Sequence, residues 1–229
     1  MITANCRARL TGDDFDFVVR VLAKREGDHG ALSRLFSDEQ ARDELLDDSS
    51  LVDAILDSPE SLRISPHLYF YVLCRRVLKD PVLRDRAVAD YIASLLEGFS
   101  RTQRLNAPEE MSEQDLHYVS DALMALTRAT PREAFLVRTH LANCALFSSG
   151  LFSENIEKRT LRGAPGLAFY EEVGRMNFHL ASSHHEAKRF GLDAIFRQLA
   201  GGFREARLAL NQLAARLMHF EPAPYPGIG

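Results

Sequence analysis

Cysteine is scarce in this chain, and no motif groups the few cysteines that are present. Three cysteines, Cys6, Cys74 and Cys144, lie far apart, and none belongs to a CxxC pair. An odd number of widely spaced thiols does not suit a disulfide framework or a cysteine-rich zinc site. We therefore expect free thiols in a reducing compartment. Cys74 and Cys144 lie in apolar stretches, so we expect both to act as small core residues.

Long hydrophobic runs and strand signals are also missing. No stretch approaches the roughly 18 consecutive apolar residues of a membrane-spanning helix. The opening residues, MITANCRARLTGDDFDF, lack the apolar run of a signal peptide. These absences predict a cytoplasmic protein with no membrane contact. The sequence shows no alternation of apolar and polar residues and no Asn-Gly hairpin turn, which predicts the all-α fold class.

Motifs for catalysis and for cofactor binding are absent as well. The sequence contains no HExxH metal motif, no GxSxG elbow, no phosphate-binding loop, and no GxGxxG after a strand. His179 and His184 are five residues apart, so they do not share one face of a helix as metal ligands would. We therefore predict no cofactor and no metal site, and place His179 on a solvated face. Whether the chain is an enzyme stays open.

The charge of the chain is modest and unevenly distributed. The net charge of −4 argues against binding to nucleic acid, which usually requires a basic surplus. Residues 1–64 contain fourteen acidic and eight basic side chains, whereas residues 156–220 contain ten basic and six acidic ones. This asymmetry admits two interpretations. It would help two copies or two partners to approach each other, or it is ordinary variation of a protein surface.

Helix signals recur along the whole chain. Thr11 is a helix cap, Pro66 suits the first turn of an apolar helix, and Thr130 with Glu133 forms a capping box. A further helix is expected after Ser112. The pattern predicts roughly nine or ten helices. Two of them, at about 66–79 and 131–148, are apolar on most faces and are expected to be the central helices around which the others pack.

The composition suggests a division of the chain into three parts. We predict an acidic N-terminal helical segment, 1–64, packed on the core, a main helical domain, 65–220, and a frayed tail, 221–229. Within the main domain a long amphipathic helix is expected from Leu167. Its core face is predicted to carry four apolar residues at helical spacing: Phe169, Val173, Met176 and Leu180.

Part of the C-terminal half resembles a known type of protein. The segments are LFSSGLF at 146–152, FYEEVGRMNFHLAS from Phe169, and a final helix rich in Phe and Leu. This pattern resembles uncharacterised bacterial all-helical proteins, and the resemblance implies no activity. From the residues themselves, we expect Gly150 to end a helix in a left-handed conformation. Gly174 is expected to let another helix approach closely.

Two classes of function fit these observations. The leading hypothesis is a protein-interaction or regulatory module that binds a partner protein or itself, with a homodimer as one form. The alternative is a helical-bundle enzyme with a buried site for a metal, haem or lipid. Seven polar residues are its candidate ligand-binding groups: Tyr69, Tyr71, Arg138, His140, Tyr170, Glu172 and His179. The alternative requires these side chains to converge on a pocket of about 300 Å³ or more.

Overall fold

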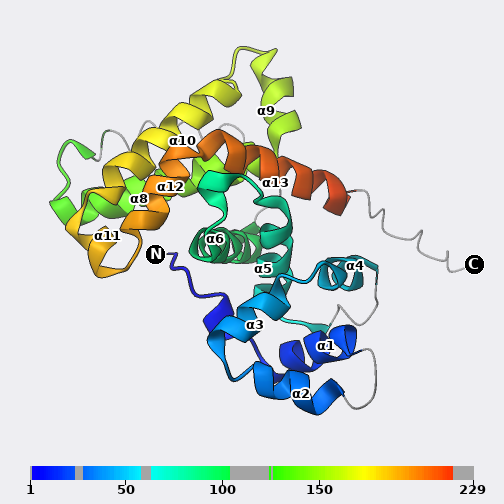
Figure 1. The fold of residues 1–229 in the computed structure, drawn as a ribbon. Coiled ribbons are helices and arrows are strands. Elements are labelled where there is room, and N and C mark those ends of the chain that lie inside the picture. The colour runs from blue at the N-terminus through cyan, green and yellow to red at the C-terminus, as the bar shows by residue number, and fades with distance from the viewer. Residues whose placement is uncertain (1, 24–27, 58–62, 104–123, 125, 219–229) are drawn as a thin grey trace, which may run out of the picture.

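The computed structural model describes all residues except 1, 24–27, 58–62, 104–123, 125 and 219–229. The described residues form twelve α-helices and two short 3-10 helices, with no strand among them (Figure 1). The predicted all-α class is thus confirmed, and the number of helices is close to the expected one. The helix predicted after Ser112 and the predicted tail 221–229 lie outside the described residues.

The elements follow one another closely along the chain. The N-terminal part contains η1 (Arg7–Arg9), α1 (Gly12–Leu22), α2 (Asp28–Leu35), α3 (Glu39–Leu46) and α4 (Ser49–Asp57). The middle part contains α5 (Pro66–Val77), η3 (Pro81–Leu83) and α6 (Arg86–Gln103). The C-terminal part contains α8 (Pro131–Leu151), α9 (Ser153–Thr160), α10 (Leu167–Ser182), α11 (His185–Arg189), α12 (Asp193–Gly201) and α13 (Phe203–Met218).

The helix starts follow the capping residues read from the sequence. The hydroxyl of Thr11 accepts a hydrogen bond from the backbone N–H of Asp14, and the Asp14 carboxylate accepts one from the backbone N–H of Thr11. Thr130 and Glu133 make the same reciprocal pair at the start of α8. Ser65 caps α5 by accepting from the N–H of Leu68. These bonds satisfy amide donors that have no partner inside the helix.

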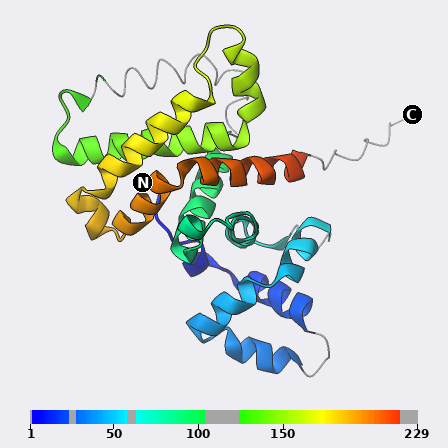
Figure 2. The ribbon, with the colours of Figure 1, turned by 45° about the horizontal axis from the view of Figure 1, so that its top comes forward.

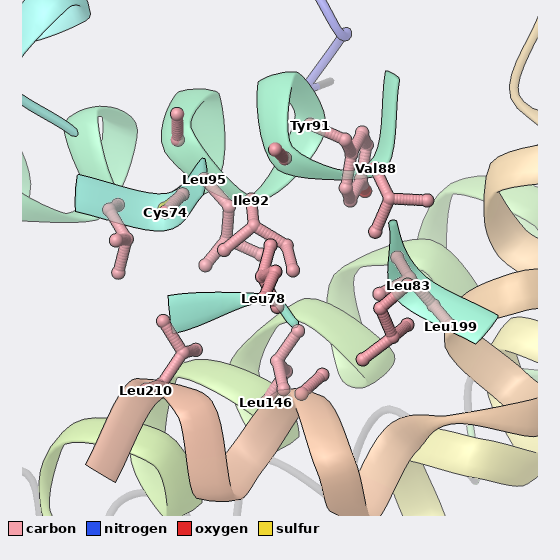
Figure 3. Packing of buried hydrophobic residues seen from close by; sticks show 14 of the residues in the cluster. Cys74, Leu78, Leu83, Val88, Tyr91, Ile92, Leu95, Leu146, Leu199 and Leu210 are labelled. Atoms are coloured by element: carbon pink, nitrogen blue, oxygen red, sulfur yellow. The ribbon is translucent and has the colours of Figure 1, made fainter. Parts of the chain in front are cut away.

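Three helices, rather than two, make up the centre of the core. The two helices expected to be central, α5 and α8, are both largely buried. A third helix, α6, packs against both of them, and all ten of its residues from Val88 to Glu97 are buried. The periodicity showed only the large apolar residues of α6, whereas alanines and a serine on its other faces also pack closely. Figure 3 shows Ile92 and Leu95 of α6 in the same core as Leu146 of α8 and Leu210 of α13.

Two glycines allow α13 to lie close to its neighbours. A Cβ atom at Gly174 of α10 would lie 2.1 Å from ring carbons of Phe203, so the predicted close approach is confirmed. The expectation that Gly150 ends a helix is wrong, because α8 continues to Leu151. A Cβ at Gly150 would lie 2.8 Å from the Cβ of Leu210, which explains why glycine occupies this position.

The predicted core face of α10 is also wrong. Figure 2 shows α10 crossing α8, and α10 also packs against α12 and, less extensively, against α13. The face turned toward these helices carries mostly small or polar residues and two rings: Tyr170, Gly174, Asn177, Phe178, Ala181 and Ser182. Phe169, Met176 and Leu180 are instead 37%, 41% and 42% exposed, and Val173 is half-buried. Helical periodicity detects an apolar stripe but does not say which neighbour covers it.

Ion pairs hold the acidic N-terminal part against the middle helices. Asp47, which follows α3, accepts from Arg75 of α5 at 2.6 Å and from Arg86 of α6 at 2.8 Å. Burial acts to raise the pKa of Asp47, but these hydrogen bonds outweigh it and lower the pKa. Part of the acidic surplus of residues 1–64 is therefore neutralised within the molecule. At these positions the acidic charge is paired within the molecule, rather than left for a second copy or a partner.

Candidate functional site

Tyr71, the most buried of the predicted ligand-binding residues, belongs to a polar cluster where the N-terminal part meets α5 and α6. The ring is fully buried, and the guanidinium carbon of Arg7 lies 5.7 Å from its centroid. Arg7 Nη1 donates to Asp43 at 2.5 Å, and the backbone N–H of Arg7 donates to Asp90 at 2.9 Å. Burial raises the pKa values of Tyr71 and Asp90. The cluster therefore joins η1 and α3 to α5 and α6.

The neighbouring Tyr69 lies in different surroundings. Its side chain is half-buried, and its ring packs edge-to-face against Phe70 with centroids 5.4 Å apart. Burial raises the pKa of its hydroxyl. The two tyrosines are two positions apart on α5, so they project from different faces of the helix and do not form one site.

Four more of the predicted residues belong to α8 or α10. Two of them lie where these helices meet, and two lie on the exposed face of α10. Arg138 of α8 is 3.4 Å from the side-chain oxygen of Asn177, and Tyr170 is buried. Glu172 is exposed and pairs with Arg175 at 2.8 Å, and His179 is also exposed, as expected for a solvated face. Glu172 and His179 therefore face away from the interior, where Tyr71 lies.

Two of the predicted residues line pockets: Glu172 lines a hollow of about 300 Å³ beside charged side chains of α10 and α13, and His140 lines a larger and less polar one. The pocket has a volume of 440 Å³ and lies between the C-terminal half of α6 and the N-terminal half of α8. Its lining residues are Ile2, Gly98, Phe99, Leu136, Thr139, His140 and Asn143. The ring of His140 is stacked on that of Phe99, with centroids 6.3 Å apart and planes 20° apart. Burial lowers the pKa of His140, so the imidazole is neutral at pH 7.

Two further polar residues of this pocket were not recognised from the sequence. Thr139 and Asn143 are 3% and 2% exposed, and the Asn143 oxygen accepts a hydrogen bond from the Tyr91 hydroxyl at 2.8 Å. Both belong to an apolar helix and are four positions apart, so they share a face. That spacing of two polar residues in an apolar helix would have pointed to Thr139 and Asn143 as candidates. The contribution of Gly98 and Phe99 was not visible, because it depends on how α6 meets α8.

Cys144 lies one turn after His140 and differs from the expectation for it. Its sulfur is 3.4 Å from His140 Nε2, and its side chain is only half-buried. Cys74, by contrast, is fully buried, as expected. All three cysteines are free thiols. The expectation of a small core residue is therefore confirmed for Cys74 and wrong for Cys144.

A larger hollow, about 700 Å³ in volume, lies beside α1. It is lined mainly by charged and polar side chains, among them Asp13, Asp16, Arg20, His29 and Arg63. Among its described lining residues, none is a buried polar group without a hydrogen-bond partner. The hollow therefore has the character of an ordinary polar surface, and the His140 pocket is the better candidate for a ligand.

The second candidate site is a surface on α10, which we call the α10 stripe. It consists of Phe169, Val173, Met176 and Leu180, which follow one another at intervals of four, three and four residues along one side of the helix. Glu172 and Arg175 lie next to it and give its border both signs of charge. An apolar stripe of this spacing is the kind of surface onto which another helix packs.

Comparison with protein-family models, with curated proteins and with solved structures finds no match for this chain. Across the described part of the chain, no three or more His, Cys, Asp or Glu side chains gather closely enough to hold a metal ion. No described helix is both long enough and apolar enough to cross a membrane. The α10 stripe and the His140 pocket are therefore the two candidate functional sites in the described part of the chain.

Proposed function

We propose that this chain is a protein-interaction or regulatory module that docks a helix of another protein molecule on the α10 stripe. The observation that carries the proposal is the exposure of three large apolar residues, Phe169, Met176 and Leu180, on one side of a well-packed helix. Contiguous apolar surface on a folded protein marks a contact site more often than single exposed residues do. Covering it with an apolar helix would remove these side chains from water.

The occupant that we propose is a second copy of this chain. The stripe is bordered by Glu172 and Arg175, so an antiparallel copy would bring opposite charges near one another instead of like charges. A single helix face is smaller than the roughly 800 Å² per partner of a standard interface. We therefore expect a dissociation constant of micromolar order.

Sedimentation velocity over a concentration series tests this proposal. The unmodified chain should change from the 25.8 kDa monomer toward a dimer as its concentration rises. A double variant, Met176→Lys with Leu180→Lys, should remain monomeric because two buried lysine charges would oppose docking. The matched control is Leu161→Lys with Leu208→Lys, which changes two exposed leucines that lie outside the stripe. This control should dimerise like the unmodified chain.

Other results separate self-association from binding to a different protein. A chain that stays monomeric at every concentration would contradict the dimer. In that case, a protein captured from the native host by the unmodified chain and by the control, but not by the double variant, would still support docking at the stripe. Equal behaviour of the two double variants would contradict a role for the stripe.

A buried ligand site is the second candidate function, and the His140 pocket is the specific observation in its favour. Its 440 Å³ exceed the volume of about 300 Å³ that a small-molecule site requires. Of the residues proposed from the sequence for such a site, the pocket includes His140. This second function and docking at the stripe involve different surfaces, so one chain can perform both.

A further inference from the structure

The lining of the His140 pocket includes a buried polar group that has no hydrogen-bond partner among the described residues. The Oγ1 atom of Thr139 is inaccessible to water, and no described residue accepts from it or donates to it. A threonine within a helix commonly donates to the carbonyl four residues earlier, but Thr139 makes no such bond. Leaving a buried hydroxyl without a partner is costly, and a native structure that does so usually has a reason. A ligand in the adjoining pocket is such a reason.

The rest of the lining defines what kind of molecule fits. None of the described lining residues is Asp, Glu, Lys or Arg, and the lowered pKa of His140 leaves its ring uncharged at pH 7. A charged ligand would therefore find no counter-ion among these described residues and would lose its hydration. Phe99 and His140 present two stacked rings, and Leu136 and Ile2 add apolar surface. Such walls favour a flat apolar molecule.

One oxygen atom on that molecule would complete the polar side of the pocket. The carbonyl side of the Asn143 amide is already held by the Tyr91 hydroxyl, so a ligand that reaches this side chain meets its NH₂ donor. Thr139 lies on the same face of α8, and a turn of its side chain about the Cα–Cβ bond would bring its hydroxyl, which has no accessible surface, to the pocket as a second donor. A ketone or phenol oxygen can accept from both groups.

We propose that the pocket between α6 and α8 binds a small uncharged aromatic molecule bearing one ketone or phenol oxygen. The rings of Phe99 and His140 hold its flat face, and the side chains of Thr139 and Asn143 hold its oxygen. This site is separate from the α10 stripe. It does not depend on the state of association of the chain.

The test is binding of the neutral fluorescent ketone 6-propionyl-2-(dimethylamino)naphthalene, whose emission shifts to the blue when it leaves water. The unmodified chain should bind it with a saturable signal, at one molecule per chain. Thr139→Val keeps the shape of the side chain and removes only the hydroxyl, so binding should weaken by about 3- to 10-fold, as expected for one hydrogen bond. Circular dichroism would verify that each variant is folded.

A matched pair of variants locates the bound probe. Leu136→Trp should fill the pocket and abolish binding, whereas Leu208→Trp changes an equally exposed leucine of α13 outside the pocket and should leave binding unchanged. The double variant of the α10 stripe should also bind normally. The proposal is overturned by absence of saturable binding to the unmodified chain, by unchanged binding in Leu136→Trp, or by unchanged binding in Thr139→Val.

Discussion

Gly174 shows how one residue sets the distance between two helices. It faces Phe203, a 2% exposed residue at the start of α13, with no room for a side chain between them. A buried ring surrounded by other rings cannot move away without disturbing its neighbours, and Phe203 lies 6.2 Å from the ring of Phe178. The position therefore depends on glycine for space, since no backbone angle there requires it.

The first prediction follows from this contact. Gly174→Ala should lower the free energy of unfolding by about 1–3 kcal/mol, because the added methyl group overpacks the core. Gly30→Ala, in the exposed part of α2, meets no atom within 4 Å. It should be neutral or stabilising by up to about 1 kcal/mol, since alanine favours the helix. Urea unfolding of both variants is the measurement. Equal effects of the two substitutions would contradict the packing argument.

Thr139 leads to a second prediction at the same scale, independent of any ligand. Thr139→Val removes a buried hydroxyl that has no partner among the described residues, so the free energy of unfolding should rise by about 1 kcal/mol. Thr160 is the matched case, because its hydroxyl donates to the carbonyl of Ile156 at 2.8 Å. Thr160→Val should lower the free energy of unfolding by about 0.5–1.5 kcal/mol. Thermal unfolding should show a more stable Thr139→Val variant and a less stable Thr160→Val variant. A lower stability of both variants would contradict the prediction.

Single helices illustrate which features the sequence makes predictable. The starts of α1, α5 and α8 were predictable because a cap and its partner lie within three residues of each other. The inward face of α10 was not, because it depends on helices that are distant in the sequence. The same limit applies to the His140 pocket. His140 stood out as a polar residue in an apolar helix, but its stacking on Phe99 depends on the meeting of α6 and α8.

Asp14 connects the starts of two helices. Its carboxylate accepts from the backbone N–H of Thr11 at 2.7 Å, and also from the backbone N–H and hydroxyl of Ser65 at 2.6 and 2.7 Å. The residue is fully buried. It therefore completes the cap of α1 and fixes the residue that caps α5. The sequence predicted Thr11 as the cap of α1 but not the bond to Ser65, because Ser65 lies 51 positions from Asp14.

A third prediction tests this connection. Asp14→Ala should lower the free energy of unfolding by about 2–4 kcal/mol, because the donors of Thr11 and Ser65 lose their shared acceptor. Asp13→Ala removes a neighbouring carboxylate that is exposed in the same first turn. This control should cost at most about 0.5 kcal/mol. Denaturant unfolding distinguishes the two. A similar small loss in both variants would show that Asp14 acts only on its own helix.

At the scale of the whole molecule, charge holds the N-terminal part on the middle helices. Asp47 lies between Arg75 and Arg86, and its pKa in the folded chain is below the ordinary value. The unfolded chain therefore binds more protons at this group when the pH falls to about 4. The stability from Asp47 is present above that pH and is lost as the pH falls through the folded pKa. The contribution of Asp90 to stability changes with pH in the opposite direction, because burial raises its pKa.

The fourth prediction follows from the lowered pKa of Asp47. Asp47→Asn should lower the free energy of unfolding at pH 7 by about 1 kcal/mol, the order expected for a partly exposed ion-pair network. The difference from the unmodified chain should shrink as the pH falls below about 4, where Asp47 of the unmodified chain becomes protonated. Urea titrations at several pH values measure it. A difference that stays constant with pH would contradict the role of the charge.

The position of Ile2 in the wall of the His140 pocket has a practical consequence. Any residues joined ahead of Ile2, such as an affinity tag, would begin at the pocket and could compete with a small molecule for it. The described end of α13 lies apart from the end of the chain marked N in both ribbon views (Figures 1 and 2). Material for binding assays is therefore best purified with its handle after α13, and screens that used an N-terminal fusion would underestimate the affinity for small ligands.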